Sequence, residues 1–312
     1  MSTPVNVDNF ATAETHRMMR DIQAANGGVN VFRHNRVPTP IDEQTVIRMN
    51  RDTLYSAAVV DISAGATITI PEHGDRYVSV MVVNEHHYIN AVFHDAGEHH
   101  LSMDQHGTRH VVLAVRTLVD PADPADVAAV AALQDGFALR ADSQRPFEMP
   151  DYDATTFDET RDALLALARN LPSFDRTFGT RDEVDPVHHL IGSAAGWGGL
   201  PSSEAVYVGV EPRLPVGQYA LTVRDVPVDG FWSVSVYNAA GFFEPNDRDA
   251  YTINNITGAR DDDGSITVRF GDYPEGTPNA LPITEGWNYL VRFYRPRAQI
   301  IDGTWTFPTL QA

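Results

Sequence analysis

The sequence contains no cysteine and no lysine among its 312 residues. Without cysteine, the chain has no thiolate nucleophile, cysteine-ligated zinc, iron–sulfur cluster or disulfide. Without lysine, it has neither a Schiff-base residue nor the phosphate-binding lysine of a P-loop. All 23 basic residues are therefore arginine. Any chemistry must come from the remaining polar side chains.

Positive charge and long apolar runs are also scarce. The formal net charge of −19 argues against nucleic acid or an anionic membrane as partner, because both require a basic surface. The segment Met1–Phe10 is polar and leads directly into a helical pattern, and no stretch is long enough to span a bilayer. We therefore expect a cytoplasmic protein with no nucleic acid and no membrane as partner.

The most informative stretch is Asp75–Tyr88, which begins as an alternating β-strand and ends in ionisable groups. Side chains of a strand point to opposite faces in turn, so Glu85 and His87 are expected on the same face as Ser79 and Met81. A carboxylate two residues from an imidazole is suited to acid–base chemistry. This pair is the leading candidate for catalysis.

A similar sequence occurs later in the chain. Phe231–Asn238 aligns with Tyr77–Asn84, sharing a serine, two valines and the final asparagine. Downstream, Val111–Arg116 and Tyr289–Arg295 are both β-rich runs that end in arginine. The match is either a coincidence of short strands or an internal repeat, and we interpret it as two related β-modules.

The fold class predicted from these patterns is mainly β with helical insertions, in two related β-sandwich or jelly-roll modules. An N-terminal helix is expected over Ala11–Ala25, and a helical linker region between the modules contains a helix over Thr156–Asn170. A further helix begins at Asp123-Pro124. The predicted segments are an N-terminal helix and loop (1–45), an N-terminal β-module (46–140), a linker with a helix and a glycine-rich loop (141–204) and a C-terminal β-sandwich (205–312).

Two other polar stretches are candidates for a site. Asn50–Tyr55 is either an ion pair with side-chain capping or the polar wall of a pocket. His188–Gly199 contains four glycines around Trp197 and is either a tight connection or a loop that faces a ligand.

Histidine is concentrated in one part of the chain, with eight of twelve between His73 and His110. Glu85 and His87 have a spacing that can bind a metal from one strand face. His99, His100 and His106 lie beside glycines, where solvated loop positions are expected. We predict no metal and no cofactor, and keep a metal-dependent enzyme as an alternative.

Several longer motifs are spread along the chain: Asn50–Tyr55 with Arg76-Tyr77, Phe231–Asn238, Phe243–Asn246, Asp263–Ser265, Leu281–Ile283 with Trp287, Arg292–Pro296 and Asp302–Trp305. Together these motifs resemble a tandem family of domains of unknown function, DUF1254 at the N-terminal side and DUF1214 at the C-terminal side. The resemblance extends from about Val46 to Pro308 and implies β-sandwich modules with helical insertions, but little about activity.

The function expected from the residues is a small-molecule enzyme of the hydrolase, lyase or isomerase type. Its pocket lies in the N-terminal β-module, and metal-independent acid–base chemistry is carried out by Glu85 and His87, with Asp52 orienting the imidazole. The expected substrate-binding residues are Arg51, Tyr55, Tyr88, Arg116, His189 and Trp197.

The main alternative is a non-catalytic β-sandwich that binds a small molecule or carbohydrate through strand aromatics. Those aromatics (Trp232, Tyr237, Trp287, Tyr294 and Trp305) have core packing as their competing interpretation. Exposed sheet edges are also compatible with a homo-oligomer.

Overall fold

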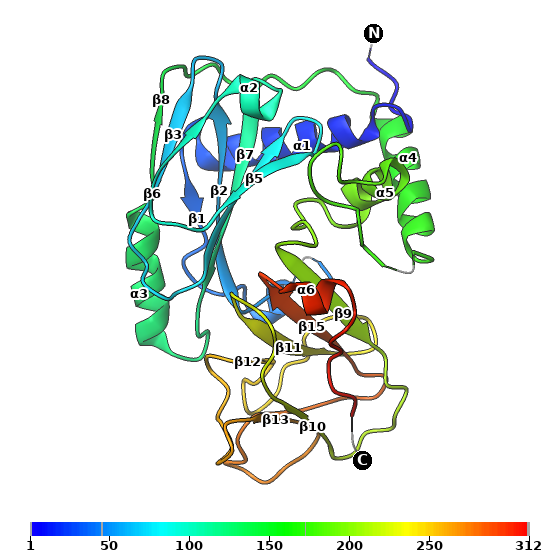
Figure 1. The fold of residues 1–312 in the computed structure, drawn as a ribbon. Helices are drawn as coiled ribbons and strands as arrows, with labels where there is room; N and C mark the ends of the chain where they lie inside the picture. The colour runs from blue at the N-terminus through cyan, green and yellow to red at the C-terminus, as the bar shows by residue number, and fades with distance from the viewer. Residues whose placement is uncertain (1, 45, 172, 311–312) are drawn as a thin grey trace. The chain divides into compact units, whose positions relative to one another are not determined.

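A computed structural model describes residues 2–44, 46–171 and 173–310, so the ends of the predicted segments at residues 1, 45 and 312 lie outside it. The fold is mainly β with an N-terminal helix and further helices, as predicted (Figure 1). The elements before residue 200 are α1 (Phe10–Asn26), β1 (Arg33–His34), η1 (Ile41–Glu43), β2 (Thr53–Asp61), β3 (Ala66–Ile70), β4 (Val78–Asn84), β5 (Ile89–Phe93), β6 (Gly97–Leu101), α2 (Met103–His106), β7 (His110–Leu118), α3 (Pro124–Asp135), β8 (Ala138–Ala141), α4 (Ala154–Ala168) and α5 (Pro186–Ala195). Those after it are β9 (Ala205–Val210), β10 (Tyr219–Val223), β11 (Trp232–Tyr237), β12 (Thr252–Asn254), β13 (Ile266–Phe270), β14 (Ala280–Leu281), β15 (Asn288–Tyr294) and α6 (Ala298–Ile301).

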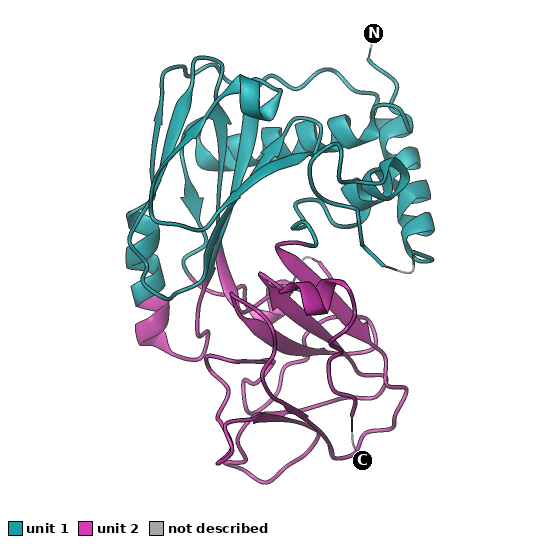
Figure 2. Cartoon of the chain, viewed as in Figure 1, with its two compact units in different colours: residues 1–36, 55–117, 129–202 teal, residues 37–54, 118–128, 203–312 magenta. Residues whose placement is uncertain are grey.

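The chain forms two compact units that interleave along the sequence (Figure 2). Unit 1 consists of residues 1–36, 55–117 and 129–202, and unit 2 of residues 37–54, 118–128 and 203–312. This division differs from the four predicted segments, because the helical region after residue 141 belongs to unit 1. Residues 37–54, assigned by sequence to the first two segments, belong to unit 2.

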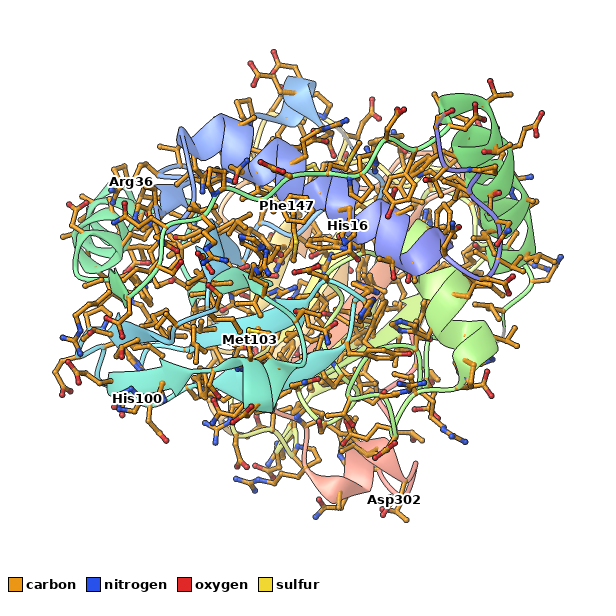
Figure 3. All side chains as sticks on the ribbon, turned by 90° about the horizontal axis from the view of Figure 1, so that it is seen from above. His16, Arg36, His100, Met103, Phe147 and Asp302 are labelled. Carbon is orange, nitrogen blue, oxygen red and sulfur yellow. The ribbon has the colours of Figure 1, made fainter. Side chains whose placement is uncertain are left out.

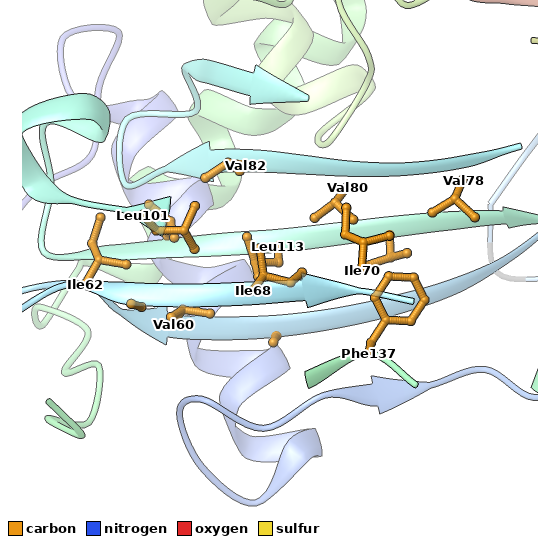
Figure 4. Packing of buried hydrophobic residues seen from close by; sticks show 14 residues of the cluster. Val60, Ile62, Ile68, Ile70, Val78, Val80, Val82, Leu101, Leu113 and Phe137 are labelled. Carbon is orange, nitrogen blue, oxygen red and sulfur yellow. The ribbon is translucent and has the colours of Figure 1, made fainter. Parts of the chain in front are cut away.

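Unit 1 contains a five-stranded sheet in the order β1-β2-β7-β4-β5 and a three-stranded sheet in the order β6-β3-β8. Alternate residues of the strands enclose one apolar core, in which Val78, Val80 and Val82 of β4 meet Ile68 and Ile70 of β3 (Figure 4). All seven residues of β4 are buried, including those on the face away from this core. Both faces of β4 are thus covered, which fits its nearly continuous run of apolar residues.

Unit 2 is built in the same manner, from sheets ordered β12-β11-β15-β9 and β10-β13-β14. Its core contains the aromatics that sequence analysis considered as a binding platform. Trp232, Tyr237, Trp287 and Tyr294 are at most 4% exposed, and Trp305 packs against the core while partly buried. The platform interpretation is therefore wrong for the first four, because both faces of the larger sheet are covered. Trp232 and Trp287 lie in the core cluster, whereas Tyr237 packs on Phe243 and Tyr294 stacks on Phe231.

The predicted internal repeat is visible in the strand order. The larger sheets read β2-β7-β4-β5 in unit 1 and β9-β15-β11-β12 in unit 2, and in the smaller sheets β3 pairs with β6 as β10 pairs with β13. The register also agrees, because Ser79 faces Arg116 across β4 and β7, and Ser233 faces Arg292 across β11 and β15. The third strand of the smaller sheets differs: β8 joins β3, whereas β14 joins β13.

Helices α1 and α4 agree with the predicted helices, and α1 ends at Gly27 in a left-handed conformation. The prediction of a glycine-rich loop from His188 is wrong as far as Ala195, because this segment is α5. Asp185 caps α5 by accepting hydrogen bonds from the backbone of Val187 and His188, and Pro186 occupies its first turn. Across the described part of the chain, no helix combines the length and apolar character needed to cross a membrane.

The close packing of α5 against Thr177 can be tested at Gly192. A Cβ there would lie 2.0 Å from Cγ2 of Thr177, so we expect Gly192→Ala to destabilise the protein by about 1–3 kcal/mol despite the higher helix propensity of alanine. The measurement is chemical denaturation. Thr177→Ser removes the obstructing methyl group, so an equal cost of Gly192→Ala in that background would contradict the steric explanation.

Candidate functional site

The strand that carries the predicted catalytic pair ends earlier than expected, at Asn84. The Asn84 side-chain oxygen accepts hydrogen bonds from the backbone N–H groups of His86 and Tyr88, both at 2.9 Å, and closes a turn. His87 has a φ of 65° in this turn. The expectation that Glu85 and His87 share one strand face is therefore wrong, because the asparagine side chain competes with continuation of the strand.

The same turn occurs in unit 2. Asn238, which aligns with Asn84, accepts hydrogen bonds from the backbone of Ala240 and Phe242 at 3.0 and 3.1 Å. Gly241 stands at the position of His87, with a φ of 87°. A left-handed φ is easy for glycine and unfavourable for histidine. Unit 1 thus retains histidine at a position where the fold itself favours glycine.

His87 is fully buried, and both of its ring nitrogens have partners. Nε2 accepts a hydrogen bond from the backbone N–H of Gly198 at 3.0 Å, so the neutral ring carries its proton on Nδ1, 3.2 Å from Oγ of Ser193. Burial, reinforced by the neighbouring His189, lowers the pKa of His87 to about 3. This imidazole is neutral at ordinary pH, and its ring nitrogens are engaged in holding the turn after α5.

Most of the predicted substrate-binding residues do gather, around that same turn. Trp197 stacks on His87 with ring centroids 5.5 Å apart, and Tyr88 stacks on His189 at 4.6 Å. Nη2 of Arg116 donates to the carbonyl of Gly198 at 2.7 Å, and its guanidinium lies over the ring of Tyr55. Burial lowers the pKa of His189. These contacts fix α5 and its following turn against the sheet.

Asp52 and Arg51 belong to unit 2. Oδ1 of Asp52, which is fully buried, accepts hydrogen bonds from Thr252 and Asn254 at 3.0 and 3.2 Å. Arg51 donates to the carbonyl of Thr39 and lies over the ring of Tyr251. A catalytic role of Asp52 and a binding role of Arg51 stay predictions.

Glu85 lies among a different set of groups, two of them histidines from distant parts of the chain. Its carboxylate is 3.5 Å from Nε2 of His16 on α1 and 3.7 Å from Nδ1 of His110 on β7, and it accepts the backbone N–H of His110 at 2.9 Å. Burial alone would raise the pKa of Glu85, but the contacts with His110 and His16 outweigh it and hold the pKa well below its usual range. Burial likewise opposes the charge on His110, yet the Glu85 carboxylate raises the pKa of that imidazole. Glu85 is thus an ionised carboxylate between two imidazoles.

His16 extends this arrangement toward a phenol. Its Nδ1 lies 3.0 Å from the hydroxyl of Tyr152, and its ring packs on Phe147 at 5.1 Å (Figure 3). Burial, with a contribution from the charge of Glu85, raises the pKa of Tyr152, so the phenol is protonated at neutral pH. Tyr152, His16 and Glu85 therefore lie in a row, joined by one hydrogen bond and by one ion-pair contact of 3.5 Å that is longer than a hydrogen bond, and we call them the Tyr–His–Glu chain.

Tyr152 also lines a pocket of about 430 Å³. This pocket combines a charged side with an apolar one. Its lining residues are Arg17, Arg20, Met149, Tyr152, Ala154, Phe157, Asp158 and Arg161. All of them belong to unit 1, as do the other members of the Tyr–His–Glu chain.

The expectation that His99, His100 and His106 are solvated loop residues is wrong in part. His99 and His100 lie on β6, where His99 stacks on Phe93 and the exposed His100 contacts the hydroxyl of Thr67. His106 is the last residue of α2 and is buried. In residues 2–44, 46–171 and 173–310, no three histidine or carboxylate side chains converge in a manner that could hold a metal ion.

Sequence reasoning missed His16, His110 and Tyr152 as partners of Glu85. His16 lies at helical spacing between Ala13 and Met19, on the buried side of α1. A histidine at such a position is the sequence signal that could have identified it, because histidine is less often buried than apolar residues. Tyr152 lies within Ala141–Ala154, a proline- and aspartate-rich segment whose composition is typical of a linker. No local pattern relates these positions to one another, because the contacts join residues far apart in the sequence. His16 and Glu85 are 69 residues apart, and His16 and Tyr152 are 136 residues apart.

The buried position of His87 gives a prediction. The unfolded chain takes up a proton at His87 near its ordinary pKa of 6.5, whereas the folded chain resists protonation until about pH 3. The free energy of unfolding should therefore fall as pH drops through this window, and His87→Gln should make that fall shallower while costing about 2–4 kcal/mol at pH 7. The measurement is urea denaturation between pH 4 and 8, with the exposed His100→Gln as the matched control. An unchanged pH slope in His87→Gln would contradict a buried neutral imidazole.

Two family profiles match the chain. Residues 29–100 match a protein of unknown function described as DUF1254, and residues 214–298 match one described as DUF1214. Among curated proteins, none matches the sequence.

Two solved structures are similar in fold. The VPA0106 protein of Vibrio parahaemolyticus has a TM-score of 0.75 and 18% identity, over 98% of this chain and 97% of that one. An uncharacterised protein of Burkholderia cenocepacia has a TM-score of 0.54 and 14% identity, over 96% of this chain and 86% of that one. The strand order shared by the two units and the two matched regions lead to one assignment: the chain is a tandem DUF1254/DUF1214 protein.

Proposed function

We propose that unit 1 is an acid–base enzyme that acts on a small molecule bound in the pocket lined by Tyr152. The observation that carries the proposal is the Tyr–His–Glu chain, because one of its ends opens into a pocket and the other is an ionised carboxylate. The proposal keeps the metal-independent acid–base chemistry expected from the sequence and takes His16 in place of His87 as the working imidazole.

The Tyr–His–Glu chain supports proton transfer in a definite order. Tyr152 donates its phenolic proton to an oxygen of the substrate as negative charge develops there. His16 acts as the imidazolium: it passes the proton on its Nδ1 to the phenolate and is left neutral, with its remaining proton on Nε2. Glu85, facing Nε2 of the same ring, stabilises the imidazolium and fixes its orientation. The reverse sequence removes a proton from the substrate. Hydrolase, lyase and isomerase reactions all require such a step.

The position of Glu85 supports this assignment over a purely structural one. Its carboxylate retains 20% of its side-chain surface, while His16 and His110 retain 10% and 6%. In the equivalent turn of unit 2 the residue at this position is Ala239, and the turn still forms. The carboxylate is therefore not needed to build the turn.

The test is the turnover of Tyr152→Phe over a panel of esters, lactones and small hydroxy acids. Phenylalanine keeps the ring packing and removes the transferable proton, so we expect turnover to fall by about 100-fold or more with unchanged thermal stability. Tyr273→Phe is the matched control, because it removes a comparable tyrosine hydrogen bond in unit 2. Turnover that survives in Tyr152→Phe would overturn the proposal.

The variants Glu85→Gln and His16→Gln test whether these two residues of the Tyr–His–Glu chain act in the chemical step or in substrate binding. Each should lower kcat by about 10- to 100-fold with little change in KM, because neither side chain lines the pocket. The measurement is the steady-state kinetics of each variant beside wild type. A change confined to KM would assign both residues to shaping the pocket.

A further inference from the structure

The sandwich of unit 2 contains a second pocket, which shares no residue with the one lined by Tyr152. Its volume is about 580 Å³, and its lining comes mainly from β9, β15 and the C-terminal segment 303–310. β9 is the last strand of the larger sheet, and side chains of the C-terminal segment pack against the core beside it. The pocket therefore adjoins the apolar interior of the sandwich.

The walls of this pocket are largely apolar. None of its fifteen lining residues carries a carboxylate, a guanidinium or an imidazole. Trp305 and Phe307 meet Phe293 edge to face, with ring centroids 5.8 and 5.7 Å apart, and form an aromatic wall. A charged ligand would lose its hydration in the pocket without gaining an opposite charge. The lining therefore favours a neutral molecule.

One buried lining residue, Tyr289 on β15, has a polar group to offer. It is 2% exposed, and its ring packs on Phe270 at 5.1 Å and on Trp287 at 6.1 Å. In the part of the chain that the structure describes, its hydroxyl has no hydrogen-bond partner. Burial raises the pKa of Tyr289 to about 12, so the phenol keeps its proton and can donate it to an acceptor. A buried hydroxyl without a partner gains most from a ligand that supplies one.

We infer that this pocket binds a neutral, largely hydrocarbon small molecule whose carbonyl oxygen accepts a hydrogen bond from the hydroxyl of Tyr289. The volume lies within the range of about 300–1,000 Å³ that is typical of small-molecule sites, and such sites combine apolar walls with a few polar groups that orient the ligand. The inference goes beyond the proposed function, because it assigns a binding site to unit 2.

A second copy of the chain is the competing occupant, because an edge strand such as β9 can be extended by another strand. Strand addition would satisfy backbone groups at the outer edge of β9. It would give no acceptor to the hydroxyl of Tyr289, which belongs to the core side of the sheet. The unpartnered phenol thus favours a small molecule over a second copy.

The experiment is isothermal titration of the full-length protein with methyl octyl ketone and with decanoate, which has the same number of carbons and is ionised at neutral pH. The ketone should bind with a Kd between about 10 μM and 1 mM. Decanoate should bind at least about tenfold more weakly, because its charge finds no partner. Tyr289→Phe should weaken the ketone by about 3- to 10-fold without lowering thermal stability, since the hydroxyl has no partner to lose. Tyr273→Phe is the matched control, because Tyr273 belongs to the same unit and does not line the pocket.

A second pair of variants tests the location of the site. Leu214 lines the pocket and is 37% exposed, so Leu214→Asp should fold and weaken the ketone by about tenfold or more. Val216 is 54% exposed and lies outside the lining, so Val216→Asp should leave the affinity unchanged.

Each outcome decides the inference. Equal binding of the ketone and decanoate, an unchanged affinity in Tyr289→Phe, or equal losses in Leu214→Asp and Val216→Asp would each overturn it. No binding of the ketone would also overturn it. If sedimentation then showed a dimer that Leu214→Asp dissociates, the surface beside β9 would belong to a second copy.

Discussion

The side-chain amide of Asn84 is the constraint on which the arrangement of unit 1 depends. Its oxygen closes the turn after β4, and its nitrogen donates to the carbonyl of His106 at 2.9 Å. The turn sends two neighbouring ionisable residues in different directions. Glu85 reaches the imidazoles of His16 and His110, while His87 enters the contacts beneath α5. One amide therefore separates the ion-pair contacts of Glu85 from the packing contacts of His87.

The two units show how one scaffold can be used in two ways. In both, an asparagine at the end of a central strand accepts backbone hydrogen bonds from the residues two and four positions later. In unit 2 the intervening positions hold Ala239 and Gly241, which suit the turn and carry no ionisable group. In unit 1 these positions hold Glu85 and His87, and His87 has the left-handed backbone conformation that is unfavourable for its side chain.

Local patterns were enough to predict the four strands that carry the repeat, β4, β7, β11 and β15, and the helix that ends at Gly27. They failed where a longer-range partner decides the outcome. The glycines after His188 indicated a loop, but Asp185 and Pro186 begin a helix, and Gly192 is required by the approach of Thr177. The pairing of Glu85 with His16 and Tyr152 could not be predicted, since it arises only when α1 and the segment before α4 pack on the sheet. His87, His189 and Trp197 were all predicted as site residues and do lie in contact, and a binding or catalytic role for them stays a prediction.

The shared strand order has a consequence for how the chain reaches its native state. Two sandwiches of one topology on one polypeptide risk pairing a strand with the wrong copy during folding. The equivalent positions differ in volume: Val78 corresponds to Trp232, and Val83 to Tyr237. An exchange of β4 for β11 would force an indole into a space shaped for valine and leave a void in the other core. The different side-chain volumes at these positions would disfavour this exchange and keep each strand in its own sandwich.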